Sequence, residues 1–512
     1  MKKLPLGIQT FENLRRDGYL YVDKTDYVFR LTHGDGKCFF LSRPRRFGKS
    51  LLLTTLKAYF EGKKELFDGL AISTMEQDWK QHPVLHLDLN TGDYSSAEGL
   101  WAMFQRHIEQ WEKTYGIVPS QTGLPERLVN IINSLCNVVV LVDEYDKPLL
   151  QAIENAELQD QFRSILKSMY SVLKTCDAHI RFALLTGVSR FSHVSIFSDL
   201  NNLQDISLSD NYAAVCGITD EELRNAFAEH IEAMALKENS SCEQVLAEAK
   251  KMYDGYHFTA SMVDIYNPFS LLNAFAQQRF DSYWYQSGTP TFLIKMLETS
   301  QVDLPDLSEG NVETDSLGDT DSVGDNWVAL FFQTGYLTIK GYDKVFNTYR
   351  MGFPNREVEM GFIQSLVPHY AQRDRSKTSN YIITSVKALQ AGDADAFLRQ
   401  MQAFLAAVPY ELVRPSENYY QTVVYLLCRM LGFYTQAEYH TSRGRIDMML
   451  QHGGYTYIFE FKIDGSADGA IAQINDRDYP LPFAADGTKL YKIGVNFNTE
   501  KRNIDDWSIC ED

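Results

Sequence analysis

The chain has no long apolar run and no regularly spaced cysteines, and these absences exclude several classes of protein. No segment approaches the run of about 20 apolar residues that a membrane-spanning helix needs. The apolar stretch after Lys2 and Lys3 ends at Gln9, which is too short for the core of a signal peptide. The seven cysteines are scattered and never spaced as CxxC, so they predict reduced thiols rather than a disulfide framework or a zinc site. We therefore expect a cytoplasmic protein with no membrane partner.

Basic residues are also in short supply. The 49 lysines and arginines face 67 acidic residues, and the formal net charge is −18. This balance argues against a surface that binds polyanions everywhere, so any contact with nucleic acid should be local. Hydrophobic residues make up 45% of the chain, and 512 residues are too many for one ordinary core. The composition therefore predicts a globular protein of several domains.

The first 215 residues alternate short apolar runs with segments of helical periodicity. Such runs predict the buried strands of a parallel sheet in an α/β domain. Ligands of these sheets bind beyond the carboxyl ends of the strands, which is where the motifs described below fall. The predicted strands are Cys38–Leu41, Val84–Leu87, Val138–Val142 and Phe182–Leu185.

The remaining sequence predicts two further regions. Residues 216–395 are mostly helical and aromatic and contain no catalytic pattern. Within them, residues 302–325 carry eight acidic and no basic residues, which predicts an exposed or mobile loop. The runs Tyr336–Lys340 and Tyr349–Phe353 predict a hairpin after a helix, a pattern compatible with a winged-helix wing. Residues 396–512 begin with a helix and continue as a second α/β pattern, which we interpret as a third domain.

A predicted strand, loop and helix meet at Gly48, Lys49 and Ser50. In this context backbone N–H groups can cradle phosphates, Lys49 can reach the β and γ groups, and Ser50 can bind magnesium. The usual pattern GxxxxGK[ST] has glycine where this chain has Arg43. Two roles are open for the arginines of this loop, which includes Arg46 and Phe47: contact with phosphate, which we favour, or contact with solvent or an acidic partner.

Two carboxylates follow the strand Val138–Val142 directly. Asp143 suits the magnesium shell, and Glu144 is placed to orient or deprotonate an attacking water, which together predict hydrolysis. The strand that ends at Thr186 should bring its tip beside the γ-phosphate. Thr186 and Ser189 are therefore candidates for sensing the phosphate, and Arg190 is a candidate for stabilising charge. A buried hydroxyl with a purely structural role is an equally good interpretation of Thr186 and Ser189.

A second group of charged residues lies near the end of the chain. The runs Phe433–Tyr439, Arg445–Leu450 and Tyr455–Lys462 predict three strands, the last two joined by a turn near residue 453. Side chains alternate along a strand, so Glu460 and Lys462 share one face, and the hairpin brings Asp447 alongside. Two carboxylates and one lysine suit a magnesium-dependent reaction on a phosphodiester. The alternative interpretation is a surface hairpin with an ordinary cross-strand ion pair.

Longer motifs extend this interpretation. The chain resembles a bacterial family that joins an AAA-ATPase-like domain to a PD-(D/E)XK nuclease-superfamily domain, and the motifs that carry the resemblance are residues 21–25, 43–50, 143–148, 186–191, 444–447, 459–462, 472–474 and Tyr479. The loop with Arg43 fits the family's own version. The resemblance implies ATP and Mg²⁺ as cofactors, Asp447 and Glu460 as metal ligands and Lys462 as the catalytic lysine. It further implies auxiliary catalytic roles for Gln473 and Glu417.

Two functional hypotheses follow. In the first, ATP binding or hydrolysis near Lys49 controls a magnesium-dependent nuclease that acts on DNA or RNA. In the second, ATP drives a binding or assembly switch, for example of a homo-oligomer, and the nuclease-like domain is a docking module that does not cleave. Membership of a nuclease superfamily does not by itself decide between them.

Overall fold

The computed structural model describes residues 1–119, 123–190, 196–197, 200, 202–288, 293, 311–318, 326–371, 375–406, 427, 429–430, 436–441, 444–483 and 487–511. The described residues form two compact units, of which the first extends to Val358 and the second begins at Glu359. The predicted three-domain boundaries at 215/216 and 395/396 remain predictions. None of the described helices is long and apolar enough to cross a membrane.

A five-stranded, entirely parallel sheet organises the first unit, in the order β2-β3-β4-β1-β5. The predicted α/β fold is therefore confirmed, and all four predicted strands are present. Their side chains are almost entirely buried because helices cover both faces of the sheet. The strands are β1 (Cys38–Ser42), β2 (Val84–Asp88), β3 (Val138–Asp143), β4 (Ile180–Gly187) and β5 (Leu203–Asp205).

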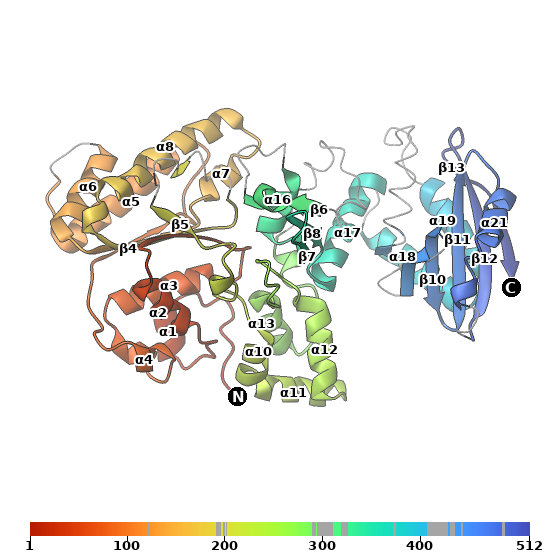
Figure 1. Ribbon diagram of the computed structural model, residues 1–512, viewed down its shortest axis with the longest axis horizontal. Helices are drawn as coiled ribbons and strands as arrows, with labels where there is room; N and C mark the ends of the chain where they lie inside the picture. Colours follow the sequence, from red (N-terminus) through yellow and green to blue (C-terminus); the bar gives the residue numbers. More distant parts are fainter. Residues whose placement is uncertain are drawn as a thin grey trace. The chain divides into compact units, whose positions relative to one another are not determined.

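Helices α5, α6 and α8 cover one face of this sheet, and α1 to α4 cover the other (Figure 1). Alternate residues of β3, Val138, Val140 and Val142, enter the core formed with α5, α6 and α8. The helices of this region are α1 (Phe11–Arg16), α2 (Thr25–His33), α3 (Lys49–Phe60), α4 (Ile72–Met75), α5 (Ala97–Tyr115), α6 (Leu124–Leu135), α7 (Lys147–Gln151) and α8 (Ala156–Thr175), with 3₁₀ turns η1 (Lys64–Phe67), η2 (Asp177–His179) and η3 (Asp210–Tyr212).

A helical region with a small sheet completes the first unit. The predicted hairpin is present as β7 (Thr338–Asp343) and β8 (Thr348–Gly352), and it follows a helix as expected. A third strand, β6 (Asn311–Glu313), pairs with β8. The other elements are α10 (Asp220–Ala226), α11 (Ala228–Glu238), α12 (Cys242–Tyr253), α13 (Pro268–Gln277), η4 (Tyr285–Ser287), η5 (Thr314–Gly318) and α16 (Trp327–Thr334).

We expected an exposed or mobile loop at residues 302–325, of which the structure describes residues 311–318, and here Glu313 and Asp315 are exposed as expected. This segment forms β6 and η5, and Leu317 is fully buried. Backbone pairing with β8 and the hydrogen bond from Gln333 Nε2 to the Leu317 carbonyl (2.9 Å) hold it in place. Acidic composition predicted solvation, but pairing to a sheet edge orders the backbone whatever its charge.

Glu357 lies in the first turn of α17 (Arg356–Ala371), and its carboxylate is fully buried. It accepts hydrogen bonds from Ser270 Oγ (2.7 Å) and from the backbone N–H groups of Trp284 (2.6 Å) and Tyr285 (3.2 Å). Burial nevertheless dominates and raises the pKa of Glu357 to about 7 from 4.5.

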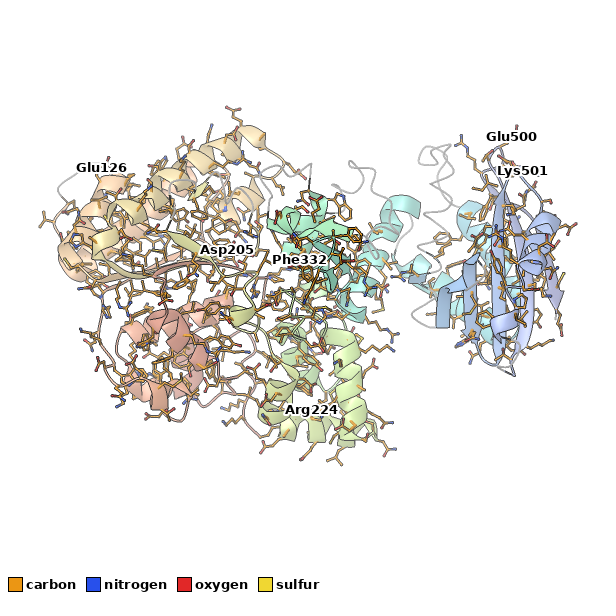
Figure 2. All side chains as sticks on the ribbon, viewed as in Figure 1. Glu126, Asp205, Arg224, Phe332, Glu500 and Lys501 are labelled. Carbon is orange, nitrogen blue, oxygen red and sulfur yellow. The ribbon has the colours of Figure 1, made fainter. Side chains whose placement is uncertain are left out.

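This raised pKa predicts a pH-dependent stability. Between pH 4.5 and 7 the unfolded chain releases the Glu357 proton before the folded chain does. The stabilisation is therefore complete below pH 4.5 and is lost as the pH rises through 7, a loss of about 3 kcal/mol. Urea unfolding at pH 5 and pH 8 should show this slope in the wild type, a flatter slope in Glu357→Gln, and the wild-type slope in a variant of the exposed Glu126 (Figure 2), Glu126→Gln.

The second unit is a five-stranded mixed sheet between helices, in the order β13-β12-β11-β10-β9. Helix α21 packs on one face through Ile474, while on the other Phe397 contacts Phe459, with ring centroids 5.7 Å apart. Phe397, Met401 and Phe404, which are spaced to share one face of a helix, are buried. The elements are α18 (Arg375–Gln390), α19 (Ala394–Ala406), β9 (Gln436–Thr441), β10 (Gly444–His452), β11 (Tyr455–Ile463), α21 (Ala467–Asp476), η6 (Leu481–Phe483), β12 (Lys489–Asn498) and β13 (Asn503–Glu511).

Candidate phosphate and carboxylate sites

The candidate phosphate loop joins β1 to α3, which begins at Lys49 as the sequence predicted. Gly48 is the N-cap of α3 and has a φ of 100°, a backbone conformation that side chains with a Cβ rarely adopt. Arg46 also has a positive φ, of 64°. The loop therefore turns sharply into the N-terminus of a twelve-residue helix, where N–H groups without intrahelical partners favour an anion.

The ammonium group of Lys49 is buried and bonded to the loop itself. Nζ donates to the carbonyl oxygens of Arg43 (2.8 Å) and Pro44 (3.1 Å). A buried cation is costly unless it is paired, and these two carbonyl oxygens partly compensate the charge of Lys49 in this structure. Ser50 follows in the first turn of α3 and is half-buried.

Asp143, at the end of β3, and Thr186, near the end of β4, are in direct contact. Thr186 Oγ1 donates to Asp143 Oδ1 at 2.9 Å, and both side chains are buried. Because β4 lies between β1 and β3, this pair lies next to the strand that leads into the phosphate loop. The contact supports the structural-hydroxyl interpretation of Thr186, whose hydroxyl positions the carboxylate of Asp143.

Glu144 follows Asp143 with a φ of 53°, which redirects the chain immediately after the strand. Burial raises the pKa of the Glu144 carboxyl, and the positive charge of Lys49 opposes this shift. Lys49 and Glu144 therefore act on each other electrostatically across the carboxyl edge of the sheet.

Asp146 is a buried carboxylate to which the sequence interpretation gave no role. Its oxygens accept hydrogen bonds from the backbone N–H groups of Val188 (3.2 Å) and Ser189 (2.6 Å) and from Ser189 Oγ (2.7 Å). Asp146 thus ties the tip of β4 to the segment after β3. Ser189 is fully buried in this contact, and its hydroxyl supports the tip of β4 through Asp146. Asp146 lies within the motif at residues 143–148, but nothing in the spacing of that motif indicated that Val188 and Ser189 would be its partners.

The three loop arginines, which we expected to contact phosphate, each contact other parts of the protein in this structure, and their contact with phosphate stays a prediction. The guanidinium of Arg43 is buried and donates to the carbonyls of Ser42 (2.9 Å), Ser207 (2.8 Å) and Tyr212 (3.1 Å). Arg45 and Arg46 lie over aromatic rings, those of Trp284 and Phe269, at 5.0 and 4.2 Å. These neighbours are carbonyls and rings from remote segments, a tertiary arrangement that the loop sequence could not reveal. Arg46 is exposed, so its guanidinium stays a predicted phosphate contact beside the backbone of Arg46 and Phe47.

Arg190 is similarly engaged. Its guanidinium forms an ion pair with Asp205 at the end of β5, at 2.7 Å, and both side chains are largely buried. The backbone N–H of Arg190 donates to Gln333 Oε1 (2.7 Å). The predicted role as a charge stabiliser therefore requires that Arg190 first leave Asp205. The sequence interpretation missed this pair because Asp205 lies in the short strand β5, which was not predicted and carries no motif.

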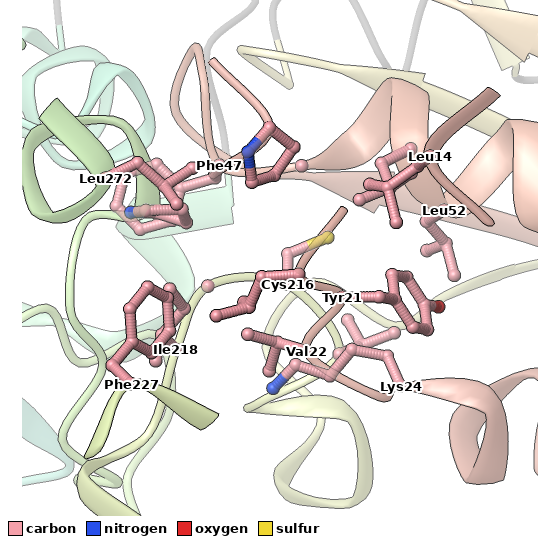
Figure 3. A pocket seen from close by; sticks show the side chains of 17 residues that line it. Leu14, Tyr21, Val22, Lys24, Phe47, Leu52, Cys216, Ile218, Phe227 and Leu272 are labelled. Atoms are coloured by element: carbon pink, nitrogen blue, oxygen red, sulfur yellow. The ribbon is translucent and has the colours of Figure 1, made fainter. Parts of the chain in front are cut away.

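An apolar cavity of about 100 Å³ adjoins the phosphate loop. Figure 3 shows that side chains from the N-terminal segment, the start of α3 and residues 215–218 surround it, among them Tyr21, Val22, Leu52, Cys216 and Ile218. The ammonium group of Lys24 lies at this cavity and pairs with Glu222 at 2.6 Å. The motif at residues 21–25 therefore lines a cavity beside Gly48, a role that the sequence interpretation did not assign.

In the second unit, Glu460 on β11 is buried, with 2% of its surface exposed. Its Oε1 contacts Lys462 Nζ at 3.4 Å and accepts a hydrogen bond from Gln473 Nε2, and Lys462 Nζ also donates to Gln473 Oε1. Its Oε2 has no hydrogen-bond partner among the described residues. Burial, and then the nearby charge of Asp447, raise the pKa of Glu460 to about 7. A buried carboxylate oxygen without a partner is a suitable ligand for a cation.

Asp447 lies beside Glu460, as the predicted hairpin requires. Met448 on β10 pairs with Phe459 on β11, and Asp447 Oδ2 accepts a hydrogen bond from the Phe461 N–H at 2.8 Å. The structure thus brings together Asp447, Glu460, Lys462 and Gln473. Glu417 lies outside the described residues. Within these, no group of three or more His, Cys, Asp or Glu side chains converges, so a metal here would also need backbone or water oxygens.

Comparison with known proteins also assigns the two candidate sites to two different domains. Residues 5–197 match the model of a predicted AAA-ATPase domain, and residues 415–507 match that of the PD-(D/E)XK nuclease superfamily. A relative from Azotobacter chroococcum mcd 1, named as an uncharacterized protein in the vnfD 5' region, is 37% identical over 98% of each chain. The chain therefore belongs to the family of proteins that join a predicted AAA-ATPase domain to a C-terminal PD-(D/E)XK nuclease-superfamily domain.

Proposed function

We propose that this protein binds and hydrolyses ATP with Mg²⁺ and thereby regulates a Mg²⁺-dependent nuclease, in its second unit, that acts on DNA or RNA. The buried Glu460 carries the nuclease part of this proposal, because one of its oxygens has no partner among the described residues while the other contacts Lys462 and Gln473. The setting of Lys49 at the helix N-terminus carries the ATP part.

In the ATP site, Lys49 holds the β- and γ-phosphates and the backbone of residues 46–50 surrounds them. Ser50 and Asp143 are the proposed magnesium ligands, and Glu144 orients the attacking water. Thr186 keeps Asp143 in position through the hydrogen bond at 2.9 Å. Arg190 acts on developing charge only after release from Asp205.

The apolar cavity beside Gly48 accommodates the base. Its lining is largely aliphatic, and a planar base of about 100 Å² apolar surface would gain about 2.5 kcal/mol on burial there. We therefore expect the wild-type protein to bind ATP about 50-fold more tightly than inorganic triphosphate, measured by calorimetry in the presence of Mg²⁺. Equal affinities would place the base outside this cavity.

In the nuclease site, Asp447 and Glu460 would hold a divalent cation, which supplies an activated water and offsets negative charge on the phosphodiester. Lys462 follows Glu460 by two residues on β11, so both side chains lie on the same face of the sheet. The ammonium group of Lys462 can donate to a phosphate oxygen or a water. Gln473 orients both Glu460 and Lys462 from helix α21. The role of Glu417 is proposed from the family resemblance alone.

The test is a cleavage assay with labelled DNA and RNA, with Mg²⁺ or Mn²⁺, and with and without ATP. We expect metal-dependent cleavage by the wild type that ATP alters and that Lys462→Ala lacks. If the wild type and Lys462→Ala form the same products at the same rate, or neither forms any, the proposed cleavage at the Glu460–Lys462 site is rejected. The alternative, an ATP-driven assembly switch with a docking module in place of a nuclease, would then predict ATP-dependent oligomerisation in size-exclusion chromatography that survives Asp447→Ala but not Lys49→Ala.

A further inference from the structure

The first half of the phosphate loop is bound to the helical region of the same unit. Arg45 donates from its guanidinium to the carbonyl of Gly288, and that guanidinium lies over the ring of Trp284 at 5.0 Å. In the opposite direction, Trp284 Nε1 donates to the Arg45 carbonyl at 2.9 Å. Both the side chain and the backbone of Arg45 are thus held by a segment more than 230 residues away in the sequence.

Close packing makes this contact specific. Trp284 is fully buried, and its ring also packs against Tyr336, with centroids 5.3 Å apart. A Cβ added to Gly288 would lie 1.8 Å from Arg45 Nη1, so the absence of a side chain at 288 makes room for the guanidinium. Pro44 has a similar close neighbour in Gly335, where an added Cβ would lie 2.8 Å from its ring.

Trp284 also has a second partner. Its backbone N–H donates to Glu357 Oε1 at 2.6 Å, and Glu357 stands in the first turn of α17. Trp284 therefore bonds on one side to the phosphate loop and on the other to the helix through which the chain leaves the first unit.

Lys49 provides a reason for this linkage to respond to nucleotide. Its ammonium group now donates to the carbonyls of Arg43 and Pro44, directly before the residue that Trp284 holds. A bound triphosphate would draw the ammonium to its own oxygens and release those carbonyls. The conformation of the loop around Arg45 would then change, and so would the contacts between Arg45 and Trp284.

We propose that Trp284 is a positioning residue of the phosphate loop, which holds the Arg45 carbonyl and couples the nucleotide state of the loop to Glu357 and the start of α17. This inference rests on the proposed ATP site. The proposal gives Arg45 a role in coupling rather than in phosphate binding. It also gives a reason for the aromatic contacts in the middle of the loop.

Hydrogen exchange on the full-length protein tests the coupling. In the wild type, saturating Mg²⁺-ATP should slow exchange in peptides that contain Trp284, Tyr285 and the first turn of α17 by at least about threefold. Phosphate oxygens bound to the loop backbone should order the residues around Arg45 in place of the Lys49 contacts, and this restricts opening of the N–H groups bonded to Glu357. Lys49→Ala should show no such change. Unchanged or faster exchange in a wild-type protein that binds ATP by calorimetry would overturn this inference and leave the ATP site standing. Failure of the wild type to bind ATP would overturn both.

The variant Trp284→Phe separates positioning from simple stability. It keeps an aromatic ring under Arg45 but removes the indole donor, so we expect ATP affinity to fall about fivefold and the nucleotide-dependent exchange at α17 to disappear. Trp111→Phe is the matched control, because Trp111 is a buried tryptophan on α5 in the core formed with α6 and α8. Both variants lose packing, but only Trp284→Phe should lose the exchange response.

A third variant guards against misfolding of Trp284→Phe. Gly288→Ala should displace the Arg45 guanidinium while leaving Trp284 intact, since the φ of Gly288, 174°, is an extended conformation that alanine adopts freely. We expect the same loss of the exchange response at α17. If Gly288→Ala and Trp284→Phe both retain the wild-type response, Trp284 does not couple the loop to α17.

Discussion

Lys462→Ala should lower the rate of metal-dependent cleavage by about 10²- to 10³-fold, the effect of removing one donor from a buried catalytic site. Its ammonium contacts Glu460 Oε1 at 3.4 Å and donates to Gln473, so it lies where a phosphodiester would approach the carboxylates. Initial rates of product formation from labelled DNA and RNA at saturating Mg²⁺ would measure the loss. Chelation of the metal should reduce the wild type to the background rate and leave the variant unchanged.

Lys489→Ala is a matched control for this prediction. Lys489 begins β12 and pairs in register with Tyr455 at the start of β11, so it lies at the opposite end of the strand from Lys462. Its exposed ion pair with Glu511, at 2.6 Å, contributes little to stability. Equal losses in both variants would indicate a general electrostatic effect on nucleic-acid binding. A loss confined to Lys462→Ala would locate the chemistry at Glu460.

Lys49→Ala should weaken binding of Mg²⁺-ATP by about 100-fold, because it removes a buried, charge-assisted contact with the phosphates. The measurement is calorimetric titration of the full-length protein, with thermal unfolding to verify that the variant is folded. Lys57→Ala, in the last turn of the same helix α3, removes an equal charge far from the loop and should bind ATP like the wild type.

The same pair of variants distinguishes a phosphate site from a structural lysine. In this structure Lys49 holds the Arg43 and Pro44 carbonyls, so its loss could lower stability without any ligand. A variant that unfolds earlier but binds ATP with wild-type affinity would reject the phosphate role of Lys49. Wild-type ATPase activity in Lys49→Ala would reject it as well.

The strands and the hairpin could be predicted from sequence because each depends on local pattern. The run Val138–Val142 is apolar without interruption and so had to be covered on both faces. The turn at Gly453 and Gly454, both with positive φ, set the register that places Asp447 beside Glu460. In both units, therefore, the order of motifs along the chain predicted which carboxylates would lie at a strand end or across a strand pair.

The partners of the charged side chains could not be predicted in the same way. The sequence predicted Arg43, Arg45 and Arg46 as phosphate ligands because their neighbours in sequence are those of a phosphate loop. Their neighbours in space are carbonyls and aromatic rings from residues 207 to 288, and no pattern in the loop sequence indicates these contacts. For Arg190 and Asp205 likewise, no spacing rule relates two residues whose contact depends on the order of strands in the sheet.

The sequence by itself determined the family, the parallel sheet with Lys49 at its carboxyl edge, and the hairpin that joins Asp447, Glu460 and Lys462, since backbone geometry and hydrophobic periodicity act over a few residues. The tertiary structure alone decided which polar groups are already satisfied. It assigned Thr186 to Asp143, Asp146 to the tip of β4, and Trp284 to both the phosphate loop and Glu357. Hydrogen bonds and ion pairs depend on distances of a few ångströms between remote segments, and only packing of the whole unit fixes these distances.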